Sequence, residues 1–333
     1  RIQNQNWFAQ PSGSLSVEQA EAATHTLDYK PSAGLEGGGP TMWWGSVTPD
    51  QQPMDDYSLV YDSEPLTESI EILGRPVARL NVSADATRAS WVVRISDVAP
   101  DGQVTQVAGA AFNGTHRNSA RNPEDIVPGE VFPLDIQLHL TSWVFQPGHK
   151  IRIAISNGMW PMLWPTREVF TSTLQIGGEL GAHIELPVVP PGAERTPEFK
   201  APADSPALPG FETIDSGNIT GYAAMTEIHT DPETGEAYGV ATNSGATQYP
   251  WGIERFEEAI EHRTHDENPA KTSVTGRYAL TQELEDRTLS FEQEVSFTSD
   301  ADNYYLRFDR KLMVDGELHS ENTLDEVIER DFQ

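Results

Sequence analysis

Two short stretches of the sequence place tryptophan beside residues that shape loops. Residues 34–45 read GLEGGGPTMWWG, and residues 157–168 read NGMWPMLWPTRE. Indole rings carry a large apolar surface and stack on sugar or prolyl rings, so these stretches could form part of a ligand site. The candidate substrate-cleft or ligand-binding residues are Met42, Trp43, Trp44, Trp160 and Trp164.

Each tryptophan pair also has a purely structural interpretation. Neighbouring side chains of an extended segment point to opposite sides, so we predict that Trp44 anchors its loop in the core and that Trp43 faces outward. Trp160 and Trp164 are each followed by a proline. Their rings either stack on a ligand or fill a corner of the core where the chain leaves a strand. Both interpretations stay open.

The sequence contains no compact catalytic motif. The G-x-S-x-G nucleophile elbow, the P-loop, H-E-x-x-H and the EF-hand loop are absent, and Met42 stands where a dinucleotide-binding glycine pattern would need its third glycine. The chain has no cysteine, which excludes disulfides and thiolate nucleophiles. We therefore expect no catalytic residue and no cofactor in this chain.

Two weaker groupings suggest metal ligands but are better explained by structure. His262 and His265 form an H-x-x-H pair without a third ligand nearby in the sequence, and we interpret them as solvated histidines in an acidic loop. Asp300 and Asp302 lack the rest of a calcium-loop signature, so we interpret them as the polar tip of a hairpin. We therefore predict no metal site.

Composition narrows the classes of partner. The 333 residues carry a net charge of −29 and are 37% hydrophobic. Such a charge repels phosphate backbones, and no stretch approaches the roughly 18 consecutive apolar residues of a membrane span. We expect neither a nucleic-acid partner nor a membrane partner. Because the first residues read like the interior of a polypeptide, we also expect a fragment or a processed product of a longer chain.

The elements that would position these residues are short strands. Apolar residues alternate over brief stretches, and turn-forming pairs such as Pro128-Gly129 and Pro147-Gly148 separate them, which is typical of an antiparallel sandwich or jelly roll. The predicted strands are residues 58–61, 70–72, 77–83, 91–98, 104–112, 132–140, 150–156, 171–176 and 182–187.

A proline-rich stretch divides the chain. We predict a jelly-roll domain over residues 1–190, a linker over 191–210 and an acidic, β-rich extension over 211–333. In the extension, residues 272–280, 288–297, 304–314 and 317–321 suit a meander, with Asp315-Gly316 as a hairpin turn. The stretch from Trp251 to Pro269 suits a helix or a strand equally.

Several stretches, in order, resemble one family. YSLVYDSEPLTESIEILGRPVARLNVSADATRASWVVRISDVAPDGQV, PGEVFPLDIQLHLTSWVFQPGHKIRIAISNGMWPMLWP and AHIELPVV resemble the C-terminal region of the Xaa-Pro dipeptidyl-peptidase and cocaine esterase family of serine hydrolases. The resemblance covers roughly residues 14–190. Upstream, LDYKPSAGLEGGGP is similar to a family segment near the substrate cleft, although Lys30 and residues 33–36 depart from its pattern. HDENPAKTSV and EVIERDF resemble the extension of some members.

The resemblance implies a galactose-binding-like jelly roll that follows an α/β-hydrolase domain. Members carry their Ser-Asp-His triad in that hydrolase domain, so the resemblance places no catalytic residue here. It implies the catalytic domain as a partner, in the same or a cleaved polypeptide, with roles in bracing that domain, lining the cleft and supporting a homo-oligomer. The alternative is a stand-alone carbohydrate-binding β-sandwich that uses its loop tryptophans.

Overall fold

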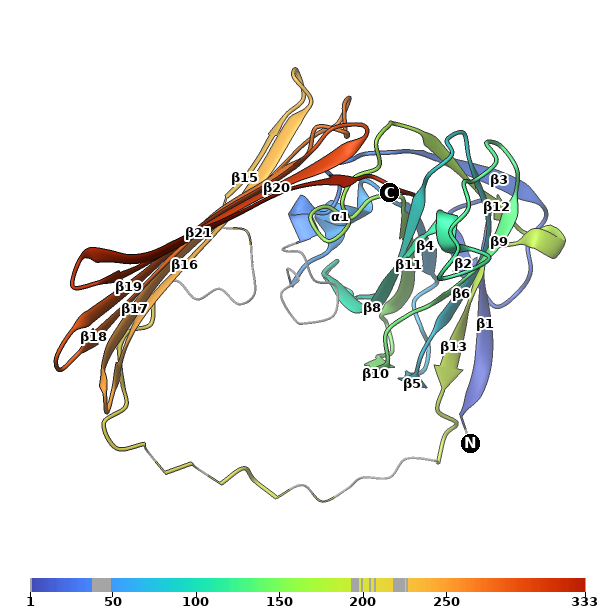
Figure 1. Ribbon diagram of the computed structural model, residues 1–333. Helices are drawn as coiled ribbons and strands as arrows, with labels where there is room; N and C mark the ends of the chain where they lie inside the picture. The colour runs from blue at the N-terminus through green and yellow to red at the C-terminus, as the bar shows by residue number, and fades with distance from the viewer. Residues whose placement is uncertain are drawn as a thin grey trace. The chain divides into compact units, whose positions relative to one another are not determined.

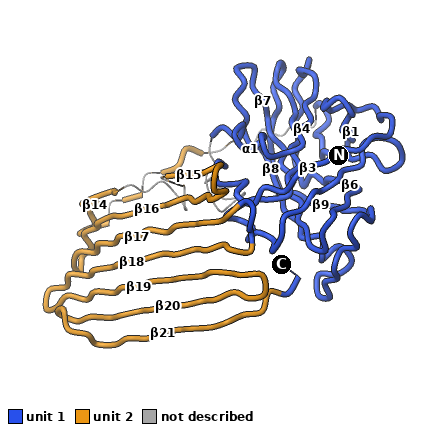
Figure 2. Tube along the Cα trace, turned by 90° about the horizontal axis from the view of Figure 1, so that it is seen from above, with its two compact units in different colours: residues 1–194, 266–269, 331–333 blue, residues 195–265, 270–330 orange. Residues whose placement is uncertain are grey.

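The computed structural model of the chain describes residues 2–37, 49–192, 198, 200–203, 205–206, 208–217, 225 and 227–332. The chain divides into two compact units (Figure 2). Unit 1 comprises residues 1–194, 266–269 and 331–333, and unit 2 comprises residues 195–265 and 270–330. Strands dominate both units (Figure 1) and almost all pair antiparallel, which confirms the predicted mostly-β fold class.

Unit 1 holds a 13-stranded sheet with the order β3-β12-β6-β13-β1-β2-β4-β11-β7-β8, to which β5, β9 and β10 add side pairings. The β2–β4 pair is parallel. The strands are β1 (Gln3–Ala9), β2 (Ser14–Ser16), β3 (Ala23–Asp28), β4 (Leu59–Ser63), β5 (Ile70–Gly74), β6 (Val77–Ala84), β7 (Ser90–Val98), β8 (Val104–Asn113), β9 (Phe132–Gln137), β10 (Thr141–Phe145), β11 (Lys150–Ser156), β12 (Thr171–Ile176) and β13 (His183–Val188).

Short helices connect these strands. They are the 3-10 turns η1 (Leu35–Gly37), η2 (Gly114–His116) and η3 (Gly178–Leu180) and the single-turn α1 (Gln52–Asp55). No helix among the described residues combines the length and apolar character needed to cross a bilayer.

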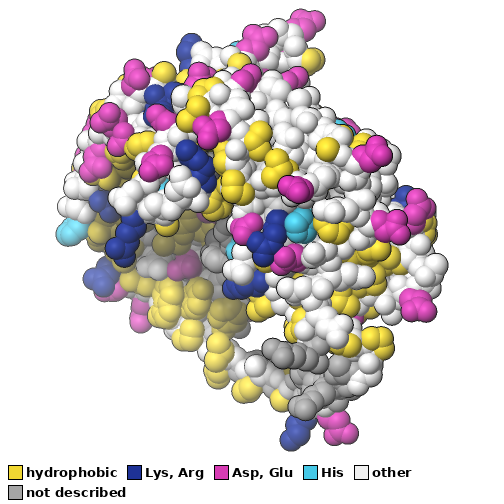
Figure 3. Space-filling view, turned by 90° about the vertical axis from the view of Figure 1, so that its right-hand side faces the viewer, with side chains coloured by type: hydrophobic (Ala, Val, Ile, Leu, Met, Phe, Trp, Pro, Cys, Tyr) yellow, Lys and Arg dark blue, Asp and Glu magenta, His cyan; other side chains and the backbone are white. Residues whose placement is uncertain are grey.

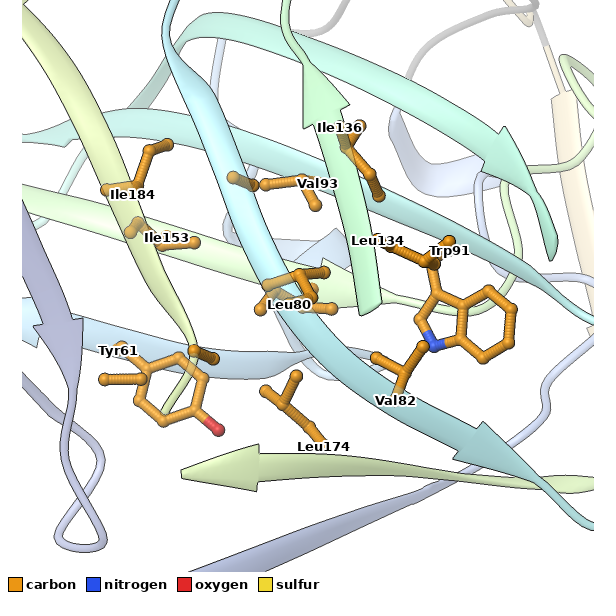
Figure 4. Close-up of a cluster of buried hydrophobic side chains, with 14 of the residues drawn as sticks. Tyr61, Leu80, Val82, Trp91, Val93, Leu134, Ile136, Ile153, Leu174 and Ile184 are labelled. Carbon is orange, nitrogen blue, oxygen red and sulfur yellow. The ribbon is translucent and has the colours of Figure 1, made fainter. Parts of the chain in front are cut away.

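The core of unit 1 follows from the alternation of its strands. In β9, Phe132, Leu134 and Ile136 are buried while the residues between them are exposed, because successive side chains of a strand point to opposite faces. Trp91 of β7 is buried and meets the ring of Phe132 edge-on, with centroids 5.6 Å apart. Figure 4 shows Trp91 in this cluster together with side chains from β4, β6, β9, β11, β12 and β13.

All nine strands predicted for unit 1 are present, with small differences at their ends. The predicted strand 132–140 ends early, because β9 stops at Gln137 and a separate strand, β10, begins at Thr141 and pairs with β5. Strands β1 to β3 were not predicted from the sequence. The first four residues of β1 are exposed polar side chains that give no apolar alternation.

Unit 2 is one antiparallel sheet of eight strands with the order β14-β16-β17-β18-β19-β20-β21, and β15 also pairs with β16. The strands are β14 (Glu212–Asp215), β15 (Glu227–Asp231), β16 (Glu236–Tyr249), β17 (Gly252–His265), β18 (Ser273–Leu284), β19 (Thr288–Ser299), β20 (Asn303–Val314) and β21 (Glu317–Glu329). The predicted meander is confirmed. Asp315 and Gly316 connect β20 to β21 with φ of 53° and 80°, as a two-residue hairpin turn requires.

The ambiguous stretch after Trp251 is a strand, β17, and this corrects one expectation. His262 is only 6% exposed on β17, so it is not a solvated loop histidine. At Asp300 the expectation of a polar hairpin tip is confirmed, because its Oδ1 accepts hydrogen bonds from the backbone N–H groups of Asp302 and Asn303, both at 2.8 Å.

Acidic side chains are spread over the face of the molecule shown in Figure 3, with basic side chains scattered among them. Within the described part of the chain, no three His, Cys, Asp or Glu residues form a group that could hold a metal ion.

Candidate functional site

Residues 33–35, at the described start of the glycine-rich stretch, lie against Trp160 of the second tryptophan-bearing stretch in unit 1. Gly34, just before η1, has φ +123°. The backbone N–H of Trp160 donates to the carbonyl oxygen of Ala33 at 2.6 Å. A side chain at position 34 would collide with the Trp160 backbone, so glycine is required there. We call residues 30–37, 51–57 and 157–164 the loop site.

Only part of the predicted tryptophan set can be placed. Met42, Trp43 and Trp44 lie outside the described residues. Trp160 is 1% exposed, whereas Trp164 is half-buried. Their rings meet edge-on, with centroids 5.4 Å apart, a favoured geometry for aromatic pairs. Trp160 thus fills the corner that follows β11, and Trp164 keeps the exposure that a ligand contact needs. The ligand role of the set stays a prediction.

Helix α1 and the residue before it are tied to the end of η1 and to β8. Gln51 donates from Nε2 to the carbonyl oxygen of Gly37 at 3.3 Å, and its backbone N–H donates to Val104 of β8 at 2.8 Å. Met54 is fully buried and packs with Val92 and Met159 in a small apolar cluster. Gly37 and Gln51 are therefore held side by side next to β8.

A buried ion-pair network lies beneath α1. Arg94 of β7 is 0% exposed and donates to Asp55 Oδ1 at 2.8 Å, while Arg152 of β11 donates to Asp55 Oδ2 at 2.8 Å and to both oxygens of Asp62. Burial lowers the pKa of Arg94, and hydrogen bonds to Asp62 raise the pKa of Arg152. Because buried charges are costly unless paired, this network fixes α1 in one position.

A partly buried charged cluster lies beside residues 51–57. Lys30 Nζ lies 2.7 Å from Asp266 Oδ2 and 5.0 Å from the ring centre of Tyr57. Asp266 Oδ1 accepts from the backbone N–H of the buried Ser32 at 2.9 Å. Burial raises the pKa of Glu36, and burial followed by the charge of Glu36 raises the pKa of Tyr57. The cluster thus gathers the carboxylates of Glu36 and Asp266 around the ammonium of Lys30.

Sequence analysis missed this charged cluster. Lys30 and Asp266 lie 236 residues apart in the chain, so no local motif joins them. The one available signal was the resemblance of the HDENPAKTSV stretch, which contains Asp266, to an extension seen in some relatives.

One histidine–carboxylate pair has the geometry of a general base. His149 Nδ1 lies 2.7 Å from Asp97 Oδ1, and Trp143 Nε1 donates to Asp97 Oδ2 at 2.9 Å. Nucleophilic catalysis of the triad type also needs a hydroxyl in hydrogen-bond contact with the other imidazole nitrogen. Within the described ranges no serine or threonine hydroxyl makes that contact. The pair instead joins β7, β10 and the start of β11.

The geometry thus defines a mostly antiparallel β unit with a shaped loop site. Residues 2–185 match the family described as the X-Pro dipeptidyl-peptidase C-terminal non-catalytic domain. The chain belongs to this family, and the resemblance found in the sequence is confirmed.

Two relatives illustrate the match. The chain is 30% identical over 195 residues to the cocaine esterase of Rhodococcus sp. (strain MB1 Bresler), an alignment that covers 53% of this chain and 34% of that protein. A solved structure of an alpha-amino acid ester hydrolase superposes with a TM-score of 0.51 at 22% identity, covering 56% of this chain and 36% of that one; this likeness shows the fold alone. The chain spans about a third of the length of the esterase it matches.

Proposed function

We propose that this chain is the C-terminal, non-catalytic portion of an α/β-hydrolase that cleaves esters, amides or Xaa-Pro dipeptides. In that protein it braces the catalytic domain, contributes the loop site to the wall of the substrate cleft and supports oligomerisation. The family match over residues 2–185 carries this proposal. We further propose that residues 191–210 link the accessory domain to the acidic extension.

The loop site is suited to a cleft wall. Its backbone is held by Gly34, Gln51 and the ion pairs of Asp55, so the described residues of the loop site are fixed in place. Preorganised loops cost less entropy on binding than mobile ones. Trp164 and the Lys30–Asp266 pair would supply one aromatic and one charged contact.

Turnover by the isolated chain tests the non-catalytic role. The purified chain should hydrolyse neither p-nitrophenyl acetate nor Ala-Pro-p-nitroanilide above the buffer rate. It should also take up no label from a serine-directed fluorophosphonate, as intact mass will show. Turnover that such a phosphonate abolishes would overturn the proposal. A homogeneous esterase of the same family serves as the positive control for both assays.

The cleft-wall role is tested in the hydrolase that carries this chain. Replacing Trp164 by alanine should raise KM more than it lowers kcat, because the side chain contacts substrate without joining the chemistry. Asp135→Ala, on the exposed end of an ion pair in β9, is the control and should leave both constants unchanged. An unchanged KM for Trp164→Ala would contradict the proposal that the loop site forms part of the cleft wall.

Carbohydrate binding is the second candidate, because Trp164 keeps a partly exposed ring. Titration of tryptophan fluorescence with oligosaccharides distinguishes a carbohydrate-binding module from the hydrolase role. A saturable change at millimolar sugar that Trp164→Ala abolishes would favour the carbohydrate module. A flat titration would leave only the hydrolase role.

A further inference from the structure

The sheet of unit 2 has one apolar face and one charged face. Cross-strand pairing places Ile260, Gly276, Val295, Phe308 and Leu324 in a single row across β17 to β21. Successive side chains alternate between faces, so residues two positions away share this side. We define the apolar face by Phe256, Ile260, Val274, Leu280, Leu289, Phe291, Val295, Leu306, Phe308, Leu312, Val314 and Leu324.

The opposite face carries many charged side chains, and several of them are paired with one another. Arg307 donates to Asp309 at 2.8 Å, and Arg263 donates to Glu261 at 3.0 Å. Two depressions of about 520 and 470 Å³ hollow the sheet here, and the smaller one is lined mostly by charged side chains. A face of that kind is stable in water.

Unit 2 by itself leaves its apolar face partly open. None of its defining side chains is fully buried, and Leu324 is 38% exposed. The two buried apolar clusters found among the described residues contain only side chains of unit 1. Five strands about 4.8 Å apart and about 40 Å long present roughly 950 Å². A stable interface needs about 800 Å² from each partner, so this face is large enough for one.

Two opposite charges interrupt the apolar face in a single row. Glu258 of β17 is followed across the sheet by Tyr278, Gln293 and then Arg310 of β20. Glu258 accepts from Asn243 at 3.0 Å, and Arg310 donates to Asn322 at 2.8 Å. Neither forms an ion pair with another described residue. They cannot pair with each other, because three strand spacings, about 14 Å, separate them.

We propose that the apolar face of unit 2 binds the same face of a second copy of this chain. A two-fold axis parallel to the strands, between β18 and β19, places β17 of one copy over β20 of the other and keeps each residue row in register. Glu258 then lies opposite the second copy's Arg310, and the reverse pair forms on the other side of the axis. Long side chains can span the roughly 10 Å between packed sheets.

The same operation matches the apolar residues in size. Gly276 comes to lie opposite Val295, and Leu280 opposite Phe291. Residues further out pair Ile260 with Phe308 and Phe256 with Leu312. A symmetric interface must be self-complementary, and the three rows through Phe256, Glu258 and Ile260 meet that condition in charge and volume. The inference rests on the oligomerisation included in the proposed function and names the surface that performs it.

Charge exchange tests the interface directly. Sedimentation of the full chain at 0.15 M salt should show a dimer with a dissociation constant of about 1 µM or tighter. Glu258→Arg and Arg310→Glu should each raise that constant at least tenfold, because each sets like charges opposite one another. The double variant E258R/R310E restores both pairs with reversed polarity, and its dissociation constant should return to within about threefold of the original.

Neighbouring residues supply matched controls. Glu257→Arg on β17 and Lys311→Glu on β20 make the same charge changes on the opposite, charged face, and both should leave dimerisation unchanged. Far-ultraviolet circular dichroism of every variant checks that the sheet is folded. Rescue by the double variant also excludes misfolding as the cause of lost association.

Three results would overturn the inference: a monomer at all concentrations, a dimer that none of the face variants weakens, or single variants that weaken it without rescue. These outcomes are separable from the proposed function. A chain that is monomeric and also lacks turnover refutes the dimer surface while leaving the non-catalytic role intact. A chain that dimerises and also shows phosphonate-sensitive turnover refutes the non-catalytic role while leaving the dimer surface intact.

Discussion

Gly34 and Trp160 approach so closely that no side chain fits between them. A β-carbon on Gly34 would lie 2.5 Å from the Trp160 backbone nitrogen and closer still to its carbonyl oxygen. Backbone atoms cannot move aside as a flexible side chain can. The contact therefore joins the glycine-rich stretch to the tryptophan-proline stretch and sets the geometry of the loop site.

Substituting alanine at Gly34 should destabilise unit 1 by about 3 kcal/mol, because strain at φ +123° adds to the backbone collision. Gly129→Ala is the matched control: its φ is +78° but no atom lies within 4 Å of an added β-carbon, so a loss of about 1 kcal/mol is expected. Urea unfolding measures both, and equal losses would show that the contact is not constraining.

Removing the carboxylate of Asp55 should cost about 3–5 kcal/mol, since Asp55→Ala leaves the buried guanidinium of Arg94 without its ion partner. Asp135→Ala removes one end of an ion pair whose side chains are 41% and 63% exposed, and should cost less than about 1 kcal/mol. Thermal melts of both variants provide the comparison. A loss at Asp55 no larger than that at Asp135 would contradict the role assigned to the network.

The Asp266 carboxylate should matter more than the ammonium it pairs with. Asp266→Ala leaves the N–H of buried Ser32 without its acceptor, at a cost of about 1–3 kcal/mol. Lys30→Met removes only the partly exposed ion pair and should cost less than about 1 kcal/mol. Asp266→Asn keeps an acceptor oxygen and should fall between them. Denaturant midpoints in that order would support the assignment; the reverse order would refute it.

Burial lowers the pKa of His262 to about 4, below its ordinary 6.5. The folded state therefore favours the neutral ring, while the unfolded state takes up a proton below pH 6.5. Its contribution to stability is complete above pH 6.5 and is lost as the pH falls towards 4, by about 3 kcal/mol in all.

Unfolding free energies measured between pH 7 and 4 test this titration. His262→Gln should flatten the dependence over that window, whereas His319→Gln, on the exposed strand β21, should leave it as it is. An unaltered slope in His262→Gln would place the titrating group elsewhere.

Much of the secondary structure could be predicted because the signal is local. Residues 77–82 alternate between partly exposed and buried positions in β6 as the sequence suggests, and Asp315-Gly316 specifies its hairpin without help from distant residues. The sequence could not choose between helix and strand after Trp251. That choice came from pairing on both sides, with β16 and β18.

The sequence by itself determined the fold class, the order of most strands and the family. The tertiary structure alone decided which distant residues meet. It brought Lys30 to Asp266 and placed Asp55 in ion pairs with arginines of two strands. It also buried His262 and placed Glu258 and Arg310 in one row of an apolar face. The reason is physical: alternation and turn chemistry act over a few residues, whereas burial and ion pairing depend on contacts that only the assembled sheets create.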